Sequence, residues 1–239
     1  MRRIASGVSG LDVAGLVVAG LVNTFLALLV AGVILASGTA AQQPDLVLRA
    51  GWIDAHALRW QLGWLFWFVV TLSFAWSYFA LGRHLRADPP WPALAIGVAL
   101  VAAAVDLVGV LVYVTVLPEL AGATVGSAVG DHAVAAAVFV SAENLAYALT
   151  NVVAFGLYTV AGLLLLPAAF ATERYPRWLS WLGVAEWGIS AFATALLVLA
   201  PDVALAPMLV GFALYAPWVW GSAWWLARER GAIGRPRDL

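Results

Sequence analysis

The sequence predicts an all-α protein, a polytopic membrane bundle of six transmembrane helices that forms a single domain over residues 1–239. Of these residues 64% are hydrophobic and only 10% are charged, whereas a soluble domain carries about 25% charged residues. The mean hydropathy is +0.95. The apolar residues also fall into blocks of about 20, the length of helix that crosses a hydrocarbon core of roughly 30 Å. We therefore expect the lipid bilayer to be the main partner of this chain.

Six apolar blocks define the predicted helices. The first block is nearly uninterrupted from Leu11 to Ala36, which is too long for a cleavable secretory signal, because the apolar core of a signal spans roughly 7 to 15 residues. Proline marks the helix breaks in two short connections, Asp88-Pro89-Pro90 and Tyr175-Pro176. The predicted spans are 11–37, 61–82, 91–117, 144–170, 178–200 and 203–228.

The arginine residues are distributed unevenly between the two sides of these helices. Cytoplasmic loops of membrane proteins retain positive charge, whereas translocated loops lose it. An even number of helices puts both termini on one side, so this bias predicts that both termini lie in the cytoplasm. Only Arg49 and Arg59 fall on the opposite side. The other ten are Arg2, Arg3, Arg83, Arg86, Arg174, Arg177, Arg228, Arg230, Arg235 and Arg237.

The two outer connections, residues 38–60 and 118–143, are longer than the inner ones. Each contains an apolar stretch, 46–48 in the first and 133–140 in the second, that is too short to span a bilayer. We interpret these stretches as short interfacial helices or as a lid over the bundle.

Composition excludes several partners and cofactors. The formal net charge is −1, so the chain lacks the large basic surface that nucleic acid requires. Every basic residue is arginine, and without lysine no Schiff base forms with a retinal-like or pyridoxal group. The absence of cysteine excludes disulfides, thiolate zinc sites and iron–sulfur clusters within the chain. We expect no cofactor.

The three histidines raise the alternatives of haem and of a metal site. His56 and His132 fall in outer connections and His84 at the inner end of the second span, so no two are expected to face each other inside the bundle as a bis-histidine haem requires. No HExxH motif is present. We interpret the outer histidines as solvated and expect no bound metal. The acids that would complete a zinc site with them are Asp54, Asp131, Glu119 and Glu143.

Two acidic residues lie near the middle of predicted spans, Asp106 in 91–117 and Glu186 in 178–200. Charged groups at this depth are costly and suggest function by default. With Asn23 and Asn151 as neutral ligands, the two acids would relay protons or bind a cation. Counting from the start of each span places Glu186 about 10 Å nearer the inner surface, so direct contact needs a shifted helix or a bridging group.

The alternative role for both acids is structural. Each would then form hydrogen bonds with Ser190, Tyr113 or Asn151 that tie helices together. The 13 tryptophans carry a similar pair of interpretations. Most fit the interfacial aromatic belts, and the deeper ones would either pack between helices or stack a flat apolar ligand such as a quinone or carotenoid. The candidate stacking residues are Trp67, Trp76, Trp187 and Trp218.

Two segments carry a resemblance to a known family: Gly162-Leu163-Leu164-Leu165-Leu166-Pro167 and Tyr175-Pro176-Arg177-Trp178-Leu179. Together they resemble a recurring pattern in small bacterial six-helix membrane proteins that are known only as a domain of unknown function. The resemblance implies the same architecture and a location in the bacterial cytoplasmic membrane. It implies no catalytic residues.

Three functions follow as hypotheses. The first is an accessory or assembly subunit of a membrane complex, without its own catalysis and with other membrane subunits as partners. The second is a proton- or cation-coupled transporter that uses Asp106 and Glu186, with the span 203–228 as its gate, because Pro207 and Pro217 would kink that helix. The third is an intramembrane binder or enzyme for a quinone, lipid or pigment. We favour the first and expect no enzymatic activity, because the chain carries no recognisable catalytic motif.

The predicted topology is testable with a fusion after Leu239. A fluorescent reporter that folds only in the cytoplasm is expected to be active there, because the arginine bias places the C-terminus inside. A fusion at the same position to an enzyme that works only outside the cytoplasm is the control and should be silent. Activity of the second fusion and not the first would reverse the orientation.

Overall fold

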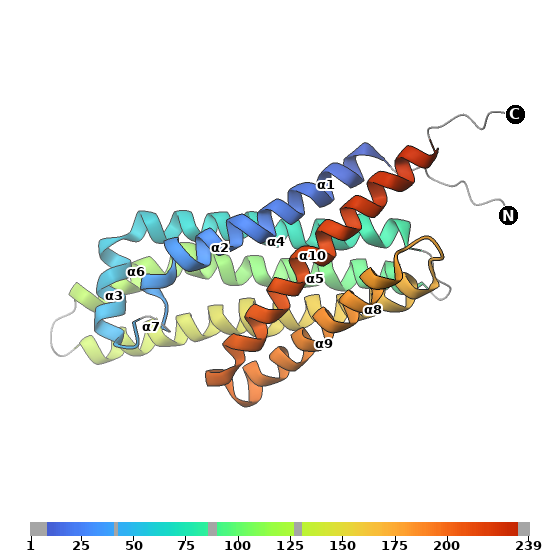
Figure 1. The fold of residues 1–239 in the computed structure, drawn as a ribbon. Coiled ribbons are helices and arrows are strands. Elements are labelled where there is room, and N and C mark those ends of the chain that lie inside the picture. The colour runs from blue at the N-terminus through green and yellow to red at the C-terminus, as the bar shows by residue number, and fades with distance from the viewer. Residues whose placement is uncertain (1–8, 41–42, 86–89, 127–130, 234–239) are drawn as a thin grey trace, which may run out of the picture. The chain divides into compact units, whose positions relative to one another are not determined.

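The computed structural model of this protein describes residues 9–40, 43–85, 90–126 and 131–233. In these ranges the chain is helical and contains no strand (Figure 1). The main helices are α1 (Gly10–Leu21), α2 (Ala27–Leu29), α3 (Leu46–Ala55), α4 (Ala57–His84), α5 (Trp91–Leu111), α6 (Leu117–Gly126), α7 (His132–Tyr147), α8 (Phe155–Ala171), α9 (Arg177–Leu199) and α10 (Pro201–Ile233). Four π-helical segments, η1 (Val22–Leu26), η2 (Val30–Ile34), η4 (Val112–Val116) and η5 (Ala148–Ala154), and the short 3₁₀ helix η3 (Ala36–Gly38) join them.

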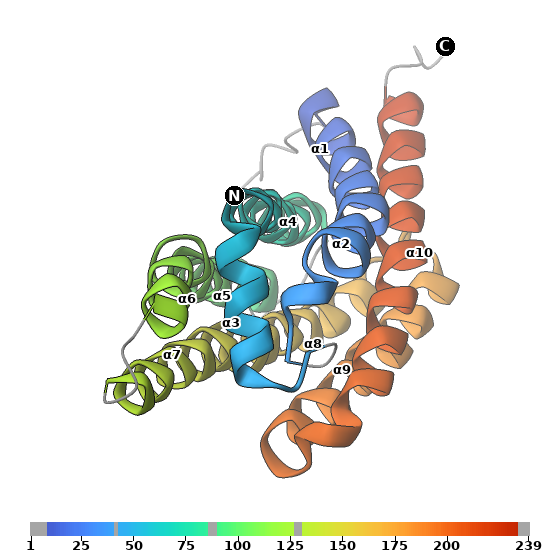
Figure 2. The ribbon, with the colours of Figure 1, turned by 90° about the vertical axis from the view of Figure 1, so that its left-hand side faces the viewer.

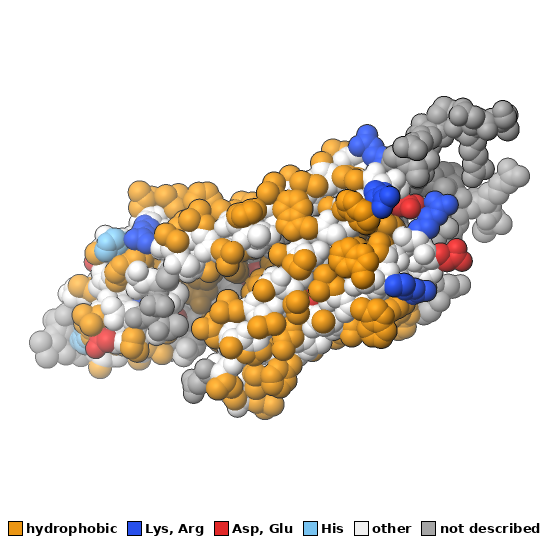
Figure 3. Space-filling view, viewed as in Figure 1, with side chains coloured by type: hydrophobic (Ala, Val, Ile, Leu, Met, Phe, Trp, Pro, Cys, Tyr) orange, Lys and Arg blue, Asp and Glu red, His pale blue; other side chains and the backbone are white. Residues whose placement is uncertain are grey.

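Six segments of the described chain are long and apolar enough to cross a membrane. Large apolar side chains remain exposed along them, and Leu11, Leu58 and Leu199 are 76%, 69% and 80% exposed. Figure 3 shows hydrophobic side chains over most of the visible helix surface, with arginines near helix ends. Such a surface requires lipid, so the chain is a multi-pass membrane protein and the predicted helical class is confirmed. The spans are Gly10–Ile34, Ala57–His84, Trp91–Gly126, His132–Ala171, Arg177–Leu199 and Val203–Arg230.

Part of the predicted orientation rests on residues outside the described ranges. These are the turn residues Asp88 and Pro89 and the arginines Arg2, Arg3, Arg86, Arg235 and Arg237. The placement of both termini in the cytoplasm therefore stays a prediction.

The helices form two compact units. Unit 1 combines Met1–Leu21, Ser73–Leu100 and Gly156–Leu239, and unit 2 combines Val22–Leu72 and Val101–Phe155. Helices α4 and α5 contribute residues to both units. The four π-helical segments found in the described chain all belong to unit 2. In a π-helix each backbone hydrogen bond joins residues five apart instead of four. This geometry is rare in proteins overall, and where it occurs it is often near a functional site.

In unit 1, α10 packs along both α9 and α1 (Figure 2). Pro201 begins α10, and the missing N–H of proline costs nothing at the first position of a helix. Gly20 allows α1 to lie close to α10, since a Cβ atom there would be 2.9 Å from Trp220 Cε2. Small residues at such positions let membrane helices approach closely.

In unit 2, aromatic side chains of α4 pack on Tyr113 of η4. The rings of Trp64 and Tyr113 stack with centroids 3.8 Å apart, and Trp60 meets Tyr113 edge-on. Helix α3 is anchored beside this core by Arg49, which is buried and donates to Glu143 Oε2 at 2.7 Å and to the Gln43 carbonyl oxygen at 2.7 Å. The ion pair therefore joins α3 to α7.

The structure differs from the sequence interpretation in the second outer connection. Residues 117–126 continue the third span as α6, and residues 132–147 form α7, which runs through η5 into α8. The stretch 133–140 is thus part of a 40-residue span and not a separate interfacial helix. In the first outer connection α3 is a separate short helix, as the sequence suggested.

The third span continues past Pro118 because side chains replace the backbone donors that are lost there. The Leu117 N–H bonds the Val112 carbonyl in the π-helical pattern, and Pro118 has no N–H. Neither of the usual helical donors therefore reaches the Tyr113 carbonyl oxygen. Trp60 Nε1 donates to it at 2.8 Å, and Gln61 Nε2 donates to the Val114 carbonyl at 3.2 Å.

Both arginines that depart from the predicted charge bias form bonds with other groups of unit 2. Arg49 pairs with Glu143, and Arg59 donates to the carbonyl oxygens of Val33 and Ile34 at the end of η2. The last carbonyls of a helix lack intrahelical donors and carry partial negative charge, which a cation satisfies. Their positions are therefore explained by local bonding, whichever side of the membrane they face.

Replacing Arg49 with Met should lower the free energy of unfolding by about 3–5 kcal/mol, because the Glu143 carboxylate then stays buried without a counter-charge. The double variant Arg49→Met with Glu143→Leu should recover most of this loss. Arg174→Gln is the matched control, since Arg174 forms its 3.2 Å pair with Glu229 at an exposed site, where such pairs contribute about 0–1 kcal/mol. Denaturant unfolding in detergent measures all three, and equal losses in the two single variants would refute the assignment.

Candidate functional site

Glu186 lies near the middle of α9 and is 2% exposed. Its Oε1 atom accepts a hydrogen bond from Ser190 Oγ at 3.2 Å. Its Oε2 atom is buried and has no hydrogen-bond partner among the described residues. A buried polar atom in this state is rare in native proteins and points to a function or to a bound species.

Two tyrosine hydroxyls lie close enough to Glu186 for electrostatic interaction, those of Tyr78 and Tyr215. Each already has a hydrogen bond elsewhere. The Tyr78 hydroxyl donates to the Tyr158 carbonyl oxygen at 2.7 Å, and the Tyr215 hydroxyl lies 2.6 Å from Ser77 Oγ. Helices α4 and α10 therefore each place a tyrosine hydroxyl within electrostatic range of the acid on α9, all within unit 1.

Aromatic rings pack around Trp187, the residue that follows Glu186 in the chain. Trp187 packs edge-on against Trp218 with ring centroids 5.5 Å apart, and against Tyr215 at 5.9 Å. Trp187 and Trp218 are 3% and 1% exposed. These two predicted stacking residues therefore pack against each other in unit 1, beside Glu186.

Two glycines make this packing possible. A Cβ atom on Gly162 of α8 would lie 2.1 Å from Trp187 Cδ2, and one on Gly211 of α10 would lie 2.6 Å from Ser190 Oγ. Real Cβ atoms do not tolerate such distances, so a side chain at either position would force its neighbour to shift. The backbones of α8 and α10 thus approach the Glu186 site directly.

Asp106, the second predicted acid, lies in α5 and belongs to unit 2. It is 5% exposed, and its Oδ2 atom accepts a 2.6 Å hydrogen bond from Thr71 Oγ1 of α4. Its Oδ1 atom is buried without a hydrogen-bond partner in the described part of the chain. Unlike the bond at Glu186, the bond at Asp106 joins two helices.

The neutral ligands proposed from the sequence both lie on π-helical segments of unit 2. Asn23 is in η1 and is 7% exposed, and Asn151 is in η5, where its Nδ2 atom donates to Thr150 Oγ1 at 2.8 Å. Glu186 belongs to unit 1 and Asp106 to unit 2. A joint site of the two acids therefore stays a prediction.

The other two candidate stacking residues have other aromatic or helical neighbours. Trp67 belongs to unit 2, where its ring meets that of Trp64 at 6.3 Å. Trp76 is in unit 1 and is 40% exposed, with Gly15 of α1 against its indole. The four tryptophans thus do not form one cluster within either unit.

The histidines of unit 2 make local contacts. His56 stacks on Trp52 with ring centroids 4.7 Å apart, and its Nδ1 atom lies 2.9 Å from the Trp52 carbonyl oxygen. His132 Nδ1 lies 3.0 Å from the Thr124 carbonyl oxygen, between α6 and α7. Across the described residues no three histidine or acidic side chains come together as a metal site would require.

The sequence interpretation missed one buried acid, Asp12 in the first turn of α1. It is 2% exposed and lies 2.9 Å from His84 Nε2 at the end of α4. The signal was present as Ser9-x-x-Asp12 before an apolar run, which is the pattern of a helix N-terminal capping box. Its partner His84, 72 residues away, was not predictable from spacing.

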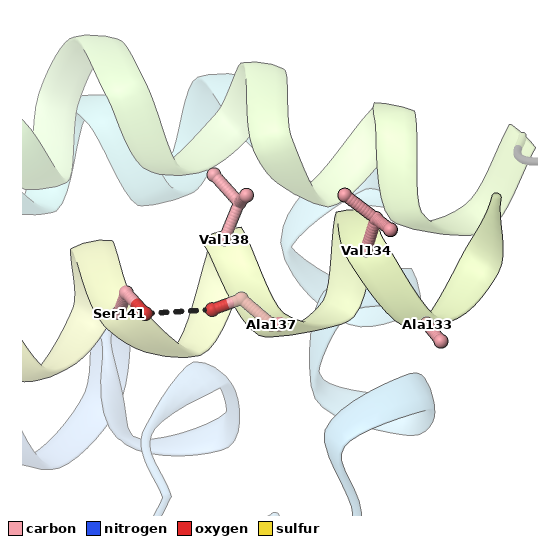
Figure 4. A pocket seen from close by; sticks show the side chains of 5 residues that line it. All are labelled: Ala133, Val134, Ala137, Val138 and Ser141. Carbon is pink, nitrogen blue, oxygen red and sulfur yellow. Dashed lines mark hydrogen bonds between the residues drawn. The ribbon is translucent and has the colours of Figure 1, made fainter.

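A shallow hollow lies on the exposed face of α7 (Figure 4). Ala133, Ala137 and Ser141 recur there every four residues, flanked by Val134 and Val138. The Ser141 hydroxyl is satisfied by the Ala137 carbonyl oxygen at 2.8 Å. None of the lining residues is titratable, so this hollow is separate in chemistry from either acid.

Comparison with known proteins matches residues 13–227 to one family, whose description is "Domain of unknown function (DUF4386)". The match runs from the first turn of α1 to the last turns of α10, and it confirms the resemblance found in the sequence of α8 and α9. No curated protein and no solved structure matches the chain.

Replacing Gly162 with Ala should destabilise the protein by about 1–3 kcal/mol, because the added methyl group overlaps the Trp187 ring. Gly188→Ala is the matched control on α9, since nothing lies within 4 Å of a Cβ atom there. That variant should stay within about 1 kcal/mol of the unmodified protein. Thermal unfolding in detergent distinguishes them, and equal stability of the two variants would contradict the close packing at Trp187.

Proposed function

Because the chain belongs to the family described as a domain of unknown function (DUF4386), its function has to be inferred from its own residues, and we propose that it is a proton-coupled transporter with Glu186 as its proton-binding group. The observation that carries this proposal is the buried Glu186 carboxyl, with one oxygen bonded only within its own helix and the other without a hydrogen-bond partner in the described chain. Acids at this depth are expensive and need a reason.

A structural role explains Asp106 better than it explains Glu186. The bond from Thr71 to Asp106 holds α4 against α5. The bond from Ser190 to Glu186 joins residues four apart on α9, so it holds no two helices together. Since helix association is the benefit expected from polar groups in a membrane protein, Glu186 is the acid for which that benefit is missing.

The surroundings of Glu186 suit a proton better than a metal cation. Calcium takes 6–8 oxygen ligands, whereas the groups around this carboxyl are aromatic rings and hydroxyls that already have hydrogen bonds. A proton needs no such shell, because protonation removes the charge that makes burial costly. Hydroxyl groups both donate and accept hydrogen bonds and can therefore pass a proton onward.

Helix α10 is the element that we propose to move during transport. Pro207 and Pro217 lie inside it, and each removes a backbone hydrogen bond and favours a kink. Between them, Gly211 lies against Ser190, which in turn donates to Glu186. A change in the α10 kink would therefore alter the hydrogen bond at the carboxyl directly.

The location that we propose is the bacterial cytoplasmic membrane, with both termini inside, which the arginine distribution supports.

The other functions considered from the sequence differ in what they require of Glu186. An accessory or assembly subunit needs the carboxyl only for stability, and a quinone, lipid or pigment binder needs the aromatic rings around it.

Glu186→Gln should reduce proton flux at least about tenfold in proteoliposomes with an imposed pH gradient and a trapped pH dye, because the amide cannot carry the proton. Asp106→Asn is the matched control, since it also neutralises a buried acid but should retain flux. Flux through Glu186→Gln equal to that of the unmodified protein would refute the transporter and leave the accessory role as the better proposal.

A further inference from the structure

We propose that Asp12 and His84 form a second proton-binding site in unit 1, through which protons reach and leave Glu186. This inference rests on the proposed function and identifies the residues on the aqueous side of the same site. It is carried by the buried contact between Asp12 and His84. It is also carried by the position of His84 on the face of α4 that bears Ser77, whose hydroxyl contacts that of Tyr215.

The contact itself is short and shielded. His84 Nε2 lies 2.9 Å from Asp12 Oδ2, and the two side chains are 8% and 2% exposed. Ser9 Oγ donates to the same carboxylate oxygen at 2.8 Å. Imidazole is the side chain that gains and loses a proton in the physiological range, and a carboxylate beside it balances the charge of the protonated form.

Helix geometry explains why these groups meet. Asp12 lies in the first turn of α1, where Ser9 Oγ also accepts from the Asp12 N–H at 3.1 Å. Negative charge is favoured at a helix N-terminus and positive charge at a C-terminus. His84 and Arg83 occupy the last turn of α4. Arg83 alone would supply the positive charge that is favoured at the C-terminus of α4. The histidine nevertheless lies closer to the Asp12 carboxylate than the arginine does, which requires a further reason.

Other charged groups face the pair from each neighbouring element. Arg83 NH1 of α4 lies 3.6 Å from Asp12 Oδ1, with its side chain 44% exposed. Arg230 of α10 lies against Gly10, where a Cβ atom would be 2.8 Å from its NH1 atom. Arg83 therefore keeps a positive charge beside the Asp12 carboxylate whether or not His84 carries a proton.

The face of α4 connects this pair to Glu186. His84 and Ser77 are seven residues apart, two helical turns on one face, with a rise of about 10 Å between them. Ser77 Oγ lies 2.6 Å from the Tyr215 hydroxyl, and Tyr215 interacts electrostatically with Glu186. Leu81 lies one turn from each end of this interval and is fully buried. In the proposed route, transient water passes this side chain.

The transfer balances at every step. Glu186 releases a proton to a transient water molecule and becomes a carboxylate, because its oxygens form no hydrogen bond with Tyr215 in the described structure. That water passes a proton to the Tyr215 hydroxyl, and the hydroxyls of Tyr215 and Ser77 each accept one proton and release another. Water beside Leu81 does the same. His84 takes the proton and becomes an imidazolium paired with the Asp12 carboxylate, and then releases it to the aqueous side. Uptake runs through the same groups in reverse.

Hydrogen–deuterium exchange of the Glu186 carboxyl, followed by infrared spectroscopy in proteoliposomes, tests this route. The carboxyl C=O band that disappears in Glu186→Gln reports the site. The variant His84→Gln keeps a polar side chain beside Asp12 but cannot carry the proton. In it we expect the same band to exchange at about one tenth of the unmodified rate or more slowly still. His132→Gln is the matched control in unit 2 and should exchange at the unmodified rate.

A purely structural role for His84 gives the opposite result. Loosening the junction of α1 and α4 would admit water and leave exchange unchanged or faster, and either outcome would overturn the inference. The unmodified protein supplies a second test that depends on no variant: the exchange rate of its Glu186 carboxyl should change with pH, and a rate independent of pH would also overturn the inference. If no carboxyl band is lost in Glu186→Gln, the proposed function itself fails, so the two failures are distinguishable.

Discussion

A membrane helix must find a hydrogen-bond partner within the protein for every backbone polar group at hydrocarbon depth, because lipid offers none. The described structure depends on this constraint wherever a helix departs from the regular pattern. The clearest case is the Tyr113 carbonyl oxygen, which loses both helical donors to η4 and Pro118 and is satisfied by Trp60 Nε1. The same indole packs edge-on against the Tyr113 ring. One side chain thus completes the backbone of η4 and helps to fill the core of unit 2.

The same constraint separates the two buried acids. A carboxyl in lipid is tolerable when it bonds another helix, and Asp106 does so through Thr71. Glu186 bonds only along α9 within the described chain, and it is held among tightly packed aromatic rings and hydroxyls of unit 1. Burying this carboxyl costs free energy, and the hydrogen bond that it forms joins no second helix. A function is therefore inferred from the chemistry of the carboxyl and not from helix packing. The Asp12–His84 pair belongs to the same unit and joins the start of α1 to the end of α4.

Unit 2 shows a different use of polar groups. Its π-helical segments carry Asn23, Tyr113 and Asn151, and its ion pair between Arg49 and Glu143 fastens a short helix to a long one. Arg59 completes the end of η2. The bonds from Trp60 to Tyr113 and from Arg59 to the end of η2 satisfy carbonyls that irregular helices leave open, so there the irregularity and the polar side chains are two parts of one solution. The contacts of Arg49 and Arg59 also explain why the two arginines that depart from the charge bias are where they are.

Hydrophobic block length was enough to identify the helical class, the six spans and the mid-span positions of Asp106 and Glu186, because the bilayer thickness sets the length of each block. The motifs of α8 and α9 were enough to suggest the family. Block length failed at residues 118–126 and 132–143, which were predicted as part of an outer connection and are helical in the structure. Near Pro118, Trp60 and Gln61 of another helix bond the carbonyl oxygens of Tyr113 and Val114. Block length also gave no sign that Asp12 meets His84, or that Asp106 bonds Thr71 while Glu186 lies beside Tyr78 and Tyr215. Such contacts depend on which faces of distant helices meet, and that is settled by side-chain packing between helices and not by the periodicity of any one of them.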